Sequence, residues 1–165
     1  MSKPTDDSVK LLLHPLKFKA FLLTRLPAAL FSGVKIVSAD ENLCEVSIPY
    51  KWFTRNPFRS TYFACLSMAA EMSTGALAMM HAQNQDQKVS MLVVKVEGEF
   101  FKKATDRAFF RCEVGGEIKR TIENCIATNE PRTIRAKSTG RNKAGEIIAE
   151  FYITWSFKAR AIKNV

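Results

Sequence analysis

Closely spaced cysteines are absent from this sequence. Its four cysteines, Cys44, Cys65, Cys112 and Cys125, stand far apart, and no two of them form a CxxC pair. Structural zinc sites and dithiol redox sites use such pairs, so neither kind of site is predicted. We expect four free thiols in a reducing cytoplasm, and neither a metal ion nor another cofactor.

Leader and repeat patterns are also missing. The apolar run Leu11–Leu13 follows two aspartates and is too short for the hydrophobic region of a signal peptide. There is no internal repeat and no low-complexity segment. With 165 residues, 47% of them hydrophobic and 25% charged, the chain has the size and composition of one globular domain spanning residues 1–165. Residues 1–8 are expected to be disordered, and a helical segment is expected at 9–31.

Acidic residues are scarce in the second half of the chain. From residue 100 onward there are 14 Lys and Arg against 7 Asp and Glu, and the whole chain carries a net charge of +9. Such a surplus favours an anionic partner, for example nucleic acid, an acidic membrane surface or a small ligand with several phosphates. A solvated basic face without a partner explains it equally well. Since no sequence motif of a nucleic-acid-binding fold accompanies the charge, nucleic acid is the least favoured partner.

The first predicted element is an amphipathic helix. Phe18, Phe21 and Leu22 fall on one helical face, and Lys and Arg residues occupy the rest. Pro15 lies near the expected start of the helix and Pro27 beyond its end, where proline is tolerated. A basic amphipathic helix packs on its own domain or lies on a membrane surface, and we favour the first arrangement.

Alternating apolar residues predict six strands. They fall at residues 33–39, 43–49, 89–101, 108–114, 134–140 and 147–157. In the third of these the alternation slips at Val93-Val94, which indicates a β-bulge. A second helix is predicted at 116–128. Short turns between most of the strands favour an antiparallel sheet.

The segment 61–80 is predicted to be the central helix. It is apolar on nearly every face and rich in alanine and other small residues, and Glu71 is its only charge. A helix of this kind is expected to be buried on all sides. Its length would also allow it to span a membrane, but a carboxylate at mid-helix is costly in lipid. We therefore expect the sheet to wrap around this helix.

That arrangement resembles the hotdog fold, an α+β fold in which a curved antiparallel sheet wraps a long central helix, over residues 32–158. Asn56, followed fifteen residues later by Glu71 on the helix, is similar to the pattern of hotdog thioesterases. The C-terminal ITWSFKAR is similar to an uncharacterised thioesterase-like branch of the superfamily. The His-Gly-Gly that one type of thioesterase carries at the helix start is replaced by Tyr62-Phe63-Ala64. Hotdog dehydratases need a histidine before the helix acid, but the two histidines here, His14 and His81, both lie outside the loop that precedes the helix, so dehydratase chemistry is disfavoured.

The resemblance implies an acyl-CoA thioesterase that works as a homodimer or homotetramer. Glu71 would be the general base or the nucleophile, and burial in an apolar helix should raise its pKa. Free backbone N–H groups near Tyr62 and Phe63 would stabilise the oxyanion. Asn56 would position the water or the thioester. In hotdog relatives the site lies across a dimer interface, so Glu71 of one subunit would face the helix start of the other.

Each of these residues also has a structural interpretation. Glu71 could be a paired carboxylate at an interface, and Asn56 a turn residue before Pro57. Ser60 and Thr61 are expected to cap the helix rather than to bind substrate. Cys65 is interpreted as a small buried residue and not as a nucleophile.

Two further sets of residues are candidates for substrate contacts. The phosphates of coenzyme A would attract basic side chains near the pocket mouth, and the candidates are Lys102, Lys103, Arg135 and Lys137. An acyl chain needs an apolar tunnel, for which the candidates are Phe53, Phe58, Met68 and Met72, although core packing explains these four equally well. The bulkier helix start also favours an alternative function, a non-catalytic acyl-CoA or fatty-acyl binding protein on the same fold.

Overall fold

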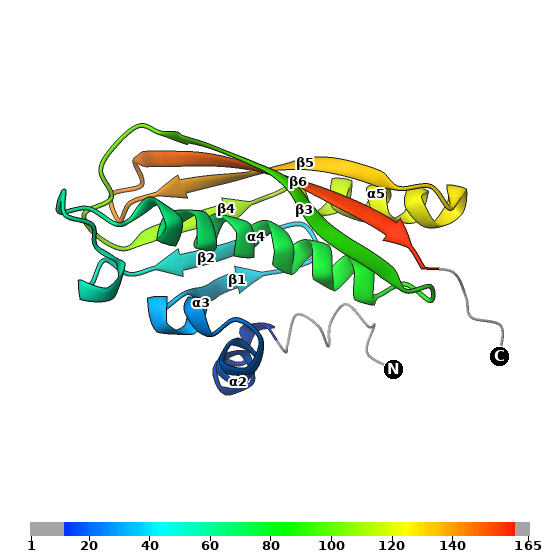
Figure 1. The fold of residues 1–165 in the computed structure, drawn as a ribbon, viewed down its shortest axis with the longest axis horizontal. Helices are drawn as coiled ribbons and strands as arrows, with labels where there is room; N and C mark the ends of the chain where they lie inside the picture. The colour runs from blue at the N-terminus through cyan, green and yellow to red at the C-terminus, as the bar shows by residue number, and fades with distance from the viewer. Residues whose placement is uncertain (1–11, 161–165) are drawn as a thin grey trace.

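The computed structural model describes residues 12–160. Its strands are β1 (Lys35–Ala39), β2 (Cys44–Ile48), β3 (Val89–Phe100), β4 (Ala108–Cys112), β5 (Arg132–Arg141) and β6 (Ile147–Ala159). Its helices are α2 (Pro15–Arg25), α3 (Pro27–Ser32), η1 (Trp52–Thr54), α4 (Phe63–Gln83) and α5 (Gly115–Thr128). The strands form one six-stranded antiparallel sheet in the order β1-β2-β4-β5-β6-β3. Figure 1 shows α4 lying along the concave side of this sheet. The predicted α+β arrangement is confirmed.

The small residues of α4 allow the sheet to approach the helix closely. Ala69, Ala70 and Ala78 are fully buried, and the Ser73 hydroxyl lies 2.7 Å from the Ser138 hydroxyl on β5. By length and hydropathy α4 would be able to cross a membrane, but 61% of its apolar window is buried inside the protein. We conclude that α4 is the core helix of a folded domain.

One face of α4 is not covered by the sheet. The expectation that this helix is buried on all sides is wrong, because a row of its residues is only half-buried. The row consists of Ala64, Ser67, Met68, Glu71, Gly75 and Met79. Apart from the adjacent pair Ser67 and Met68, they are spaced by three or four residues, which places them on one side of the helix. We call this row the open face of α4.

The edge strand β3 is also partly uncovered. It pairs with β6 along one side, and the register skips between Val93 and Lys95, which confirms the predicted bulge. Val96 and Phe100 on β3 are paired with Ile153 and Ala149 on β6, and these two partners are buried on the concave side of the sheet. The side chains of Val96 and Phe100 point to the same side but are 49% and 51% exposed. A long apolar edge of this kind is a surface that proteins normally cover.

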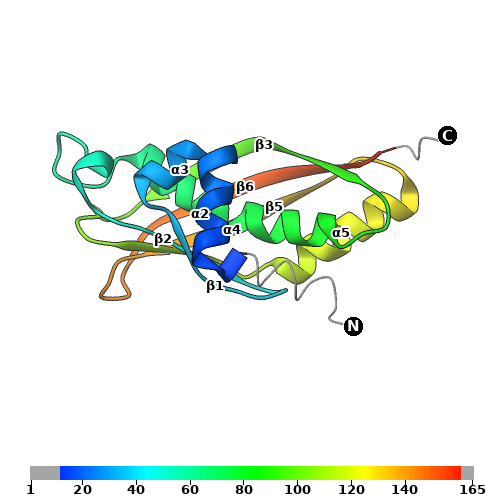
Figure 2. The same cartoon turned by 90° about the horizontal axis from the view of Figure 1, so that it is seen from below.

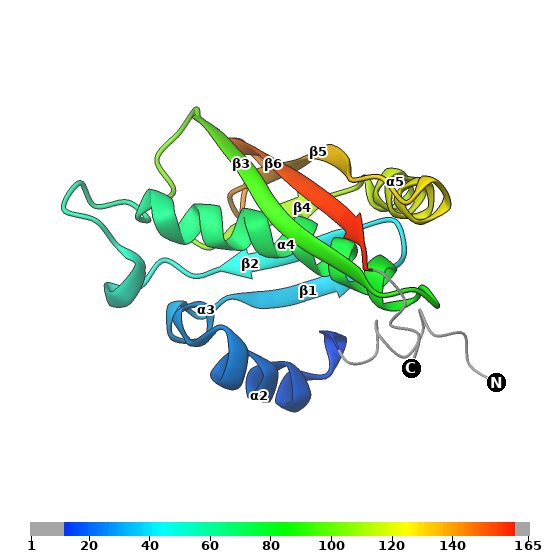
Figure 3. The same cartoon turned by 45° about the vertical axis from the view of Figure 1, so that its right-hand side comes forward.

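The N-terminal part of the described chain is divided by Pro27. The described part of the helical segment expected at 9–31 contains two helices. α2 ends at Arg25, before Pro27 as expected, and Pro27 begins the second short helix α3. Proline fits the first position of a helix, where its missing N–H has no intrahelical acceptor. Figures 2 and 3 show α2 outside β1 and crossing the direction of α4. The predicted disorder of residues 1–8 lies outside the described residues.

All four cysteines are buried and free. Cys44 and Cys112 occupy opposite positions on β2 and β4. Burial raises the pKa of Cys44 to about 12 and that of Cys112 to about 11, so both remain protonated thiols at neutral pH. Burial likewise raises the pKa of Cys65, in agreement with its interpretation as a small buried residue.

Candidate active site

The loop before α4 is organised by Asn56. Its side-chain oxygen accepts hydrogen bonds from the backbone N–H of Phe58 (3.0 Å) and from the N–H and hydroxyl of Ser60 (both 3.2 Å). This pattern closes the turn that contains Pro57 and Arg59, the latter with a left-handed φ of 58°. The structure therefore shows the turn role for the Asn56 carbonyl oxygen.

Ser60 and Thr61 do not cap α4, so this expectation is wrong. The N-cap position is Tyr62, one residue later, and no side chain bonds there. The Thr61 hydroxyl instead donates to the carbonyl of Ala104 (3.1 Å), and the Ser60 hydroxyl bonds to Asn56. Both hydroxyls stabilise the loop and its contact with the segment after β3.

The first turn of α4 presents free hydrogen-bond donors. Within residues 12–160 no acceptor faces the backbone N–H of Phe63 or Ala64. The N–H of Tyr62, which we expected to be free, donates to the carbonyl of Thr54 at 2.7 Å. The first turn contains no acidic residue, so the positive end of the helix dipole is uncompensated there. The candidate oxyanion donors are therefore Phe63 and Ala64.

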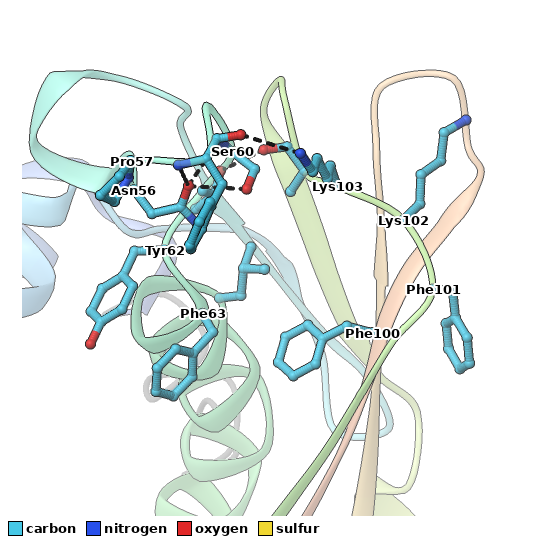
Figure 4. A pocket seen from close by; sticks show the side chains of 13 residues that line it. Asn56, Pro57, Ser60, Tyr62, Phe63, Phe100, Phe101, Lys102 and Lys103 are labelled. Carbon is cyan, nitrogen blue, oxygen red and sulfur yellow. Dashed lines mark hydrogen bonds between the residues drawn. The ribbon is translucent and has the colours of Figure 1, made fainter.

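A pocket of about 590 Å³ opens at this helix start, and we call it the helix-start pocket. It is lined by Asn56, Pro57, Phe58, Ser60, Thr61, Tyr62, Phe63, Leu66, Phe100, Phe101, Lys102, Lys103 and Ala104. Figure 4 shows Phe100 pointing toward Phe63 across the pocket, while Lys102 points outward at its rim. The structure thus brings together five of the six predicted site residues, all except Glu71.

Only two of the four candidate phosphate contacts lie at this pocket. Lys102 forms an exposed ion pair with Glu146, and the Lys103 ammonium lies 3.4 Å from the carbonyl of Phe58. Arg135 and Lys137 are on the outer face of the sheet. They are paired there with Glu97 on β3 (2.9 Å) and Glu150 on β6 (2.8 Å) respectively.

Glu71 lies at a separate cavity of about 140 Å³, which we call the α2–α4 cavity. Its lining residues are Leu12, Phe18, Phe21, Leu26, Glu71, Met72, Gly75, Ala76, Met79, Met91 and Trp155. Burial raises the pKa of the Glu71 carboxyl above its ordinary value, as predicted. Among residues 12–160 its carboxylate has no hydrogen-bond donor and no cationic partner. This is unusual for a half-buried acid and makes Glu71 a candidate for function.

The two parts of the site do not meet within one subunit. Glu71 follows Phe63 by eight residues, which corresponds to roughly 12 Å along the helix axis. The helix-start pocket and the α2–α4 cavity have no lining residue in common. One chain therefore supplies either the acid or the donors at a given place, but not both.

Sequence reasoning missed Trp155 and Gly75 beside Glu71. The Trp155 indole N–H donates to the Thr74 hydroxyl at 2.9 Å, which fixes the ring against α4. A methyl group on Gly75 would lie 3.0 Å from the Trp155 ring and 3.1 Å from the Glu71 carboxylate. A glycine inside a helix lowers the stability of the helix by roughly 1 kcal/mol relative to alanine. The position of Gly75 in the middle of a helix was therefore the sequence signal that could have pointed to this site.

The four candidates for an acyl tunnel do not lie together in one pocket. Phe58 lines the helix-start pocket and Met72 lines the α2–α4 cavity, whereas Phe53 and Met68 line neither. His81 is buried and bonded to the carbonyl of Glu41 at 2.8 Å, so it stabilises the fold.

Comparison with known proteins supports the fold assignment. No protein-family model and no curated protein sequence matches the chain. A protein of unknown function from Pseudomonas aeruginosa, described as a probable thioesterase, has a TM-score of 0.72 at 16% identity over 88% of this chain and 97% of that one. A protein of unknown function from Chlorobaculum tepidum has a TM-score of 0.75 at 15% identity, over 90% and 98%. A thioesterase from Haemophilus influenzae has a TM-score of 0.63 at 12% identity, over 88% and 92%. The chain therefore has the hotdog fold of these thioesterase-like proteins.

Proposed function

We propose that this protein hydrolyses acyl-CoA thioesters as a cytoplasmic homodimer. The observation that carries the proposal is Glu71, a half-buried carboxylate with a raised pKa and no partner among residues 12–160. Fold likeness to thioesterases and the free N–H groups at the start of α4 point to the same chemistry. Four free thiols are compatible with a reducing compartment.

The proposed reaction needs one base and one set of donors. Glu71 takes a proton from water, and the water oxygen attacks the thioester carbonyl carbon. The N–H groups of Phe63 and Ala64 stabilise the negative oxygen of the tetrahedral intermediate. The carbon–sulfur bond then breaks and the proton on Glu71 passes to the leaving thiolate. The products are a free thiol and a carboxylic acid, which releases its proton to solvent as a carboxylate.

A dimer would bring the base and the donors together. Figure 3 shows β3 crossing beside α4 at the edge of the sheet. Val96 and Phe100 on this strand are exposed. A second copy related by a twofold axis would cover the exposed side of β3 and the part of the open face that α2 leaves uncovered, and would pair the two β3 edges. In that arrangement Glu71 of one subunit would approach Phe63 of the other.

A non-catalytic acyl-binding protein is the second candidate. The observation that favours it is the bulky helix start, where the exposed rings of Tyr62 and Phe63 pack edge to face with centroids 4.9 Å apart. These rings could exclude a thioester carbonyl from the free N–H groups.

Thiol release from a panel of acyl-CoAs of increasing chain length tests the proposal. We expect the wild type to hydrolyse part of the panel and Glu71→Gln to lose at least about 100-fold in kcat, the usual contribution of a general base. Glu123→Gln, on the exposed side of α5, is the control and should retain wild-type rates. If the wild type binds acyl-CoA but releases no thiol, the binding protein is the correct assignment.

A further inference from the structure

The α2–α4 cavity differs from an ordinary packing defect in the composition of its walls. Ten of its eleven lining residues are non-polar or aromatic, and Glu71 is the exception. The apolar residues of α4 that line it, Met72, Gly75, Ala76 and Met79, follow Glu71 along the helix. The cavity therefore begins at the carboxylate and continues as an apolar space toward Met79, roughly 12 Å farther along the axis.

The floor of the cavity is held open by a specific arrangement. The hydrogen bond from Trp155 to Thr74 fixes the indole ring beside α4. Gly75 leaves the space that a side chain would take from the ring and from the Glu71 carboxylate. Alanine would be the better helix former at this position, so the glycine keeps a gap at a cost in helix stability.

The outer wall of the cavity is α2. Phe18 and Phe21 are stacked with centroids 6.3 Å apart, and both face the cavity together with Leu12 and Leu26. A second cavity of about 270 Å³ also borders α2 and shares Leu12 and Phe18 as lining residues. Since two cavities border α2, we expect this wall to yield to an occupant.

We infer that the α2–α4 cavity is the acyl-chain subsite, with α2 as its movable wall and Met79 as the residue that limits chain length. The inference rests on the proposed function, because it takes the thioester carbonyl to lie at Glu71. The cavity of about 140 Å³ has room for about five groups of the size of a water molecule, and a methylene group is similar in size. Short acyl chains fit as the cavity stands, and longer ones require α2 or Met79 to move.

The charge at the cavity mouth discriminates between substrate and product. A thioester carbonyl is neutral, whereas the released fatty acid is an anion. No cationic side chain within residues 12–160 pairs with the Glu71 carboxylate, so an acid product bound in the same place would face an unscreened like charge. The subsite therefore favours the thioester over the free acid of the same length.

Trp155 makes occupancy of this cavity measurable without catalysis. The chain has two tryptophans, and Trp52 is 77% exposed on η1, away from the cavity. In the Trp52→Phe variant, Trp155 is the only indole. S-alkyl-CoA thioethers that carry bromine near the start of the alkyl chain cannot be hydrolysed, and bromine quenches tryptophan fluorescence at contact distance. We expect saturable quenching by these ligands, and tighter binding of the thioether than of the matching fatty acid.

A Met79 variant and an exposed control variant test the chain-length limit in the same experiment. Met79→Ala should shift the preferred chain, in thioether binding and in thiol release, toward longer acyl groups by two or more carbons. Val37→Ala removes an apolar side chain that is 48% exposed on β1, outside the cavity, and should keep the wild-type preference.

The outcomes separate the subsite from the function. Quenching of Trp155 without thiol release would retain the subsite and overturn the hydrolase. If acyl-CoAs are hydrolysed but the bound thioether leaves Trp155 unquenched, the subsite is overturned and the hydrolase is retained. Equal shifts in chain-length preference in Met79→Ala and Val37→Ala would have the same meaning. Absence of both binding and thiol release would overturn both.

Discussion

The start of α4 and its midpoint differ in chemistry although they belong to one helix. The helix-start pocket is large, at about 590 Å³, and has two lysines and free N–H groups in its walls. The α2–α4 cavity is about a quarter of that size, at about 140 Å³, and its one charge is a carboxylate. One place suits anionic oxygen and phosphate, and the other suits a neutral apolar chain beside a base. The proposed reaction requires both places in one site, and hence two subunits.

The largest expected effect follows from separating the two places. Val96→Glu puts a charge on the exposed concave side of β3, which should convert the dimer into monomers. Thiol release should then fall by at least about 100-fold, because within a monomer the base and the donors lie too far apart to act on the same thioester. Light scattering measures the molar mass of the Val96→Glu protein in solution, and thiol release is measured on the same sample.

The opposite edge of the sheet provides the matched control for this variant. Val37 on β1 is 48% exposed, against 49% for Val96. Val37→Glu should therefore leave mass and activity unchanged. Val96→Glu monomers that retained full activity would show that one subunit contains the whole site.

Removing one donor from the helix-start pocket should cost about 100-fold in kcat, the usual effect of losing an oxyanion donor. Phe63→Pro removes the backbone N–H at the first position of α4. Proline is tolerated at this position of a helix, and the extended conformation of Tyr62 (ψ 133°) is compatible with a proline after it. Phe63→Ala also removes the ring but keeps the N–H, so it should lose much less. Equal losses in the two variants would assign the effect to the ring.

The lysines of the helix-start pocket should affect binding rather than chemistry. Replacing Lys102 and Lys103 by alanine should raise KM for acyl-CoAs roughly three- to tenfold at low salt, since exposed charge pairs contribute up to about 1 kcal/mol each. An acyl-pantetheine thioester lacks the phosphates of coenzyme A, so its KM should change little in the double variant. The double variant Lys119→Ala/Lys158→Ala, at exposed positions outside the pocket, is the control.

The smallest effect is on stability and depends on pH. The folded-state pKa of Glu71 is raised, so ionisation of this carboxyl destabilises the fold, and that cost appears as pH rises from the unfolded-state pKa to the folded-state pKa. Glu71→Gln should melt about 2–4 °C higher than the wild type at pH 8, equivalent to about 1 kcal/mol for a chain of this size. The difference should vanish near pH 4. Calorimetry at several pH values measures it, and a lower Tm for Glu71→Gln at pH 8 would indicate a structural, paired carboxylate.

The sequence predicted the framework of this molecule because strand and helix periods are local properties. The alternation through Ile153, Trp155 and Phe157 defines β6, and the slip at Val93-Val94 marks the bulge. Glu71 was identified as a candidate site residue because it is the only charge in an apolar helix, which the composition of the segment shows without any structure.

Contacts between distant segments were not predictable in the same way. The Thr61 hydroxyl bonds to Ala104, 43 residues away, and a cap expected from local residue type was lost to that partner. The sequence of α4 is apolar on every side, so it did not indicate that the sheet of the same subunit would leave one face of this helix uncovered. Arg135 and Lys137 were phosphate candidates by charge alone, but strand pairing places them beside Glu97 and Glu150 on the outer face.

Mixed dimers test the central claim, a site shared between two subunits, most directly. Glu71→Gln and Phe63→Pro chains are purified separately, unfolded together and refolded at equal amounts. In a mixed dimer one of the two sites has both an intact base and intact donors. We expect the mixture to recover about a quarter of the wild-type activity, since half of the randomly paired dimers are mixed and each has one working site of two. Activity no higher than the average of the two variants, with subunit exchange verified by differential labelling, would contradict the account.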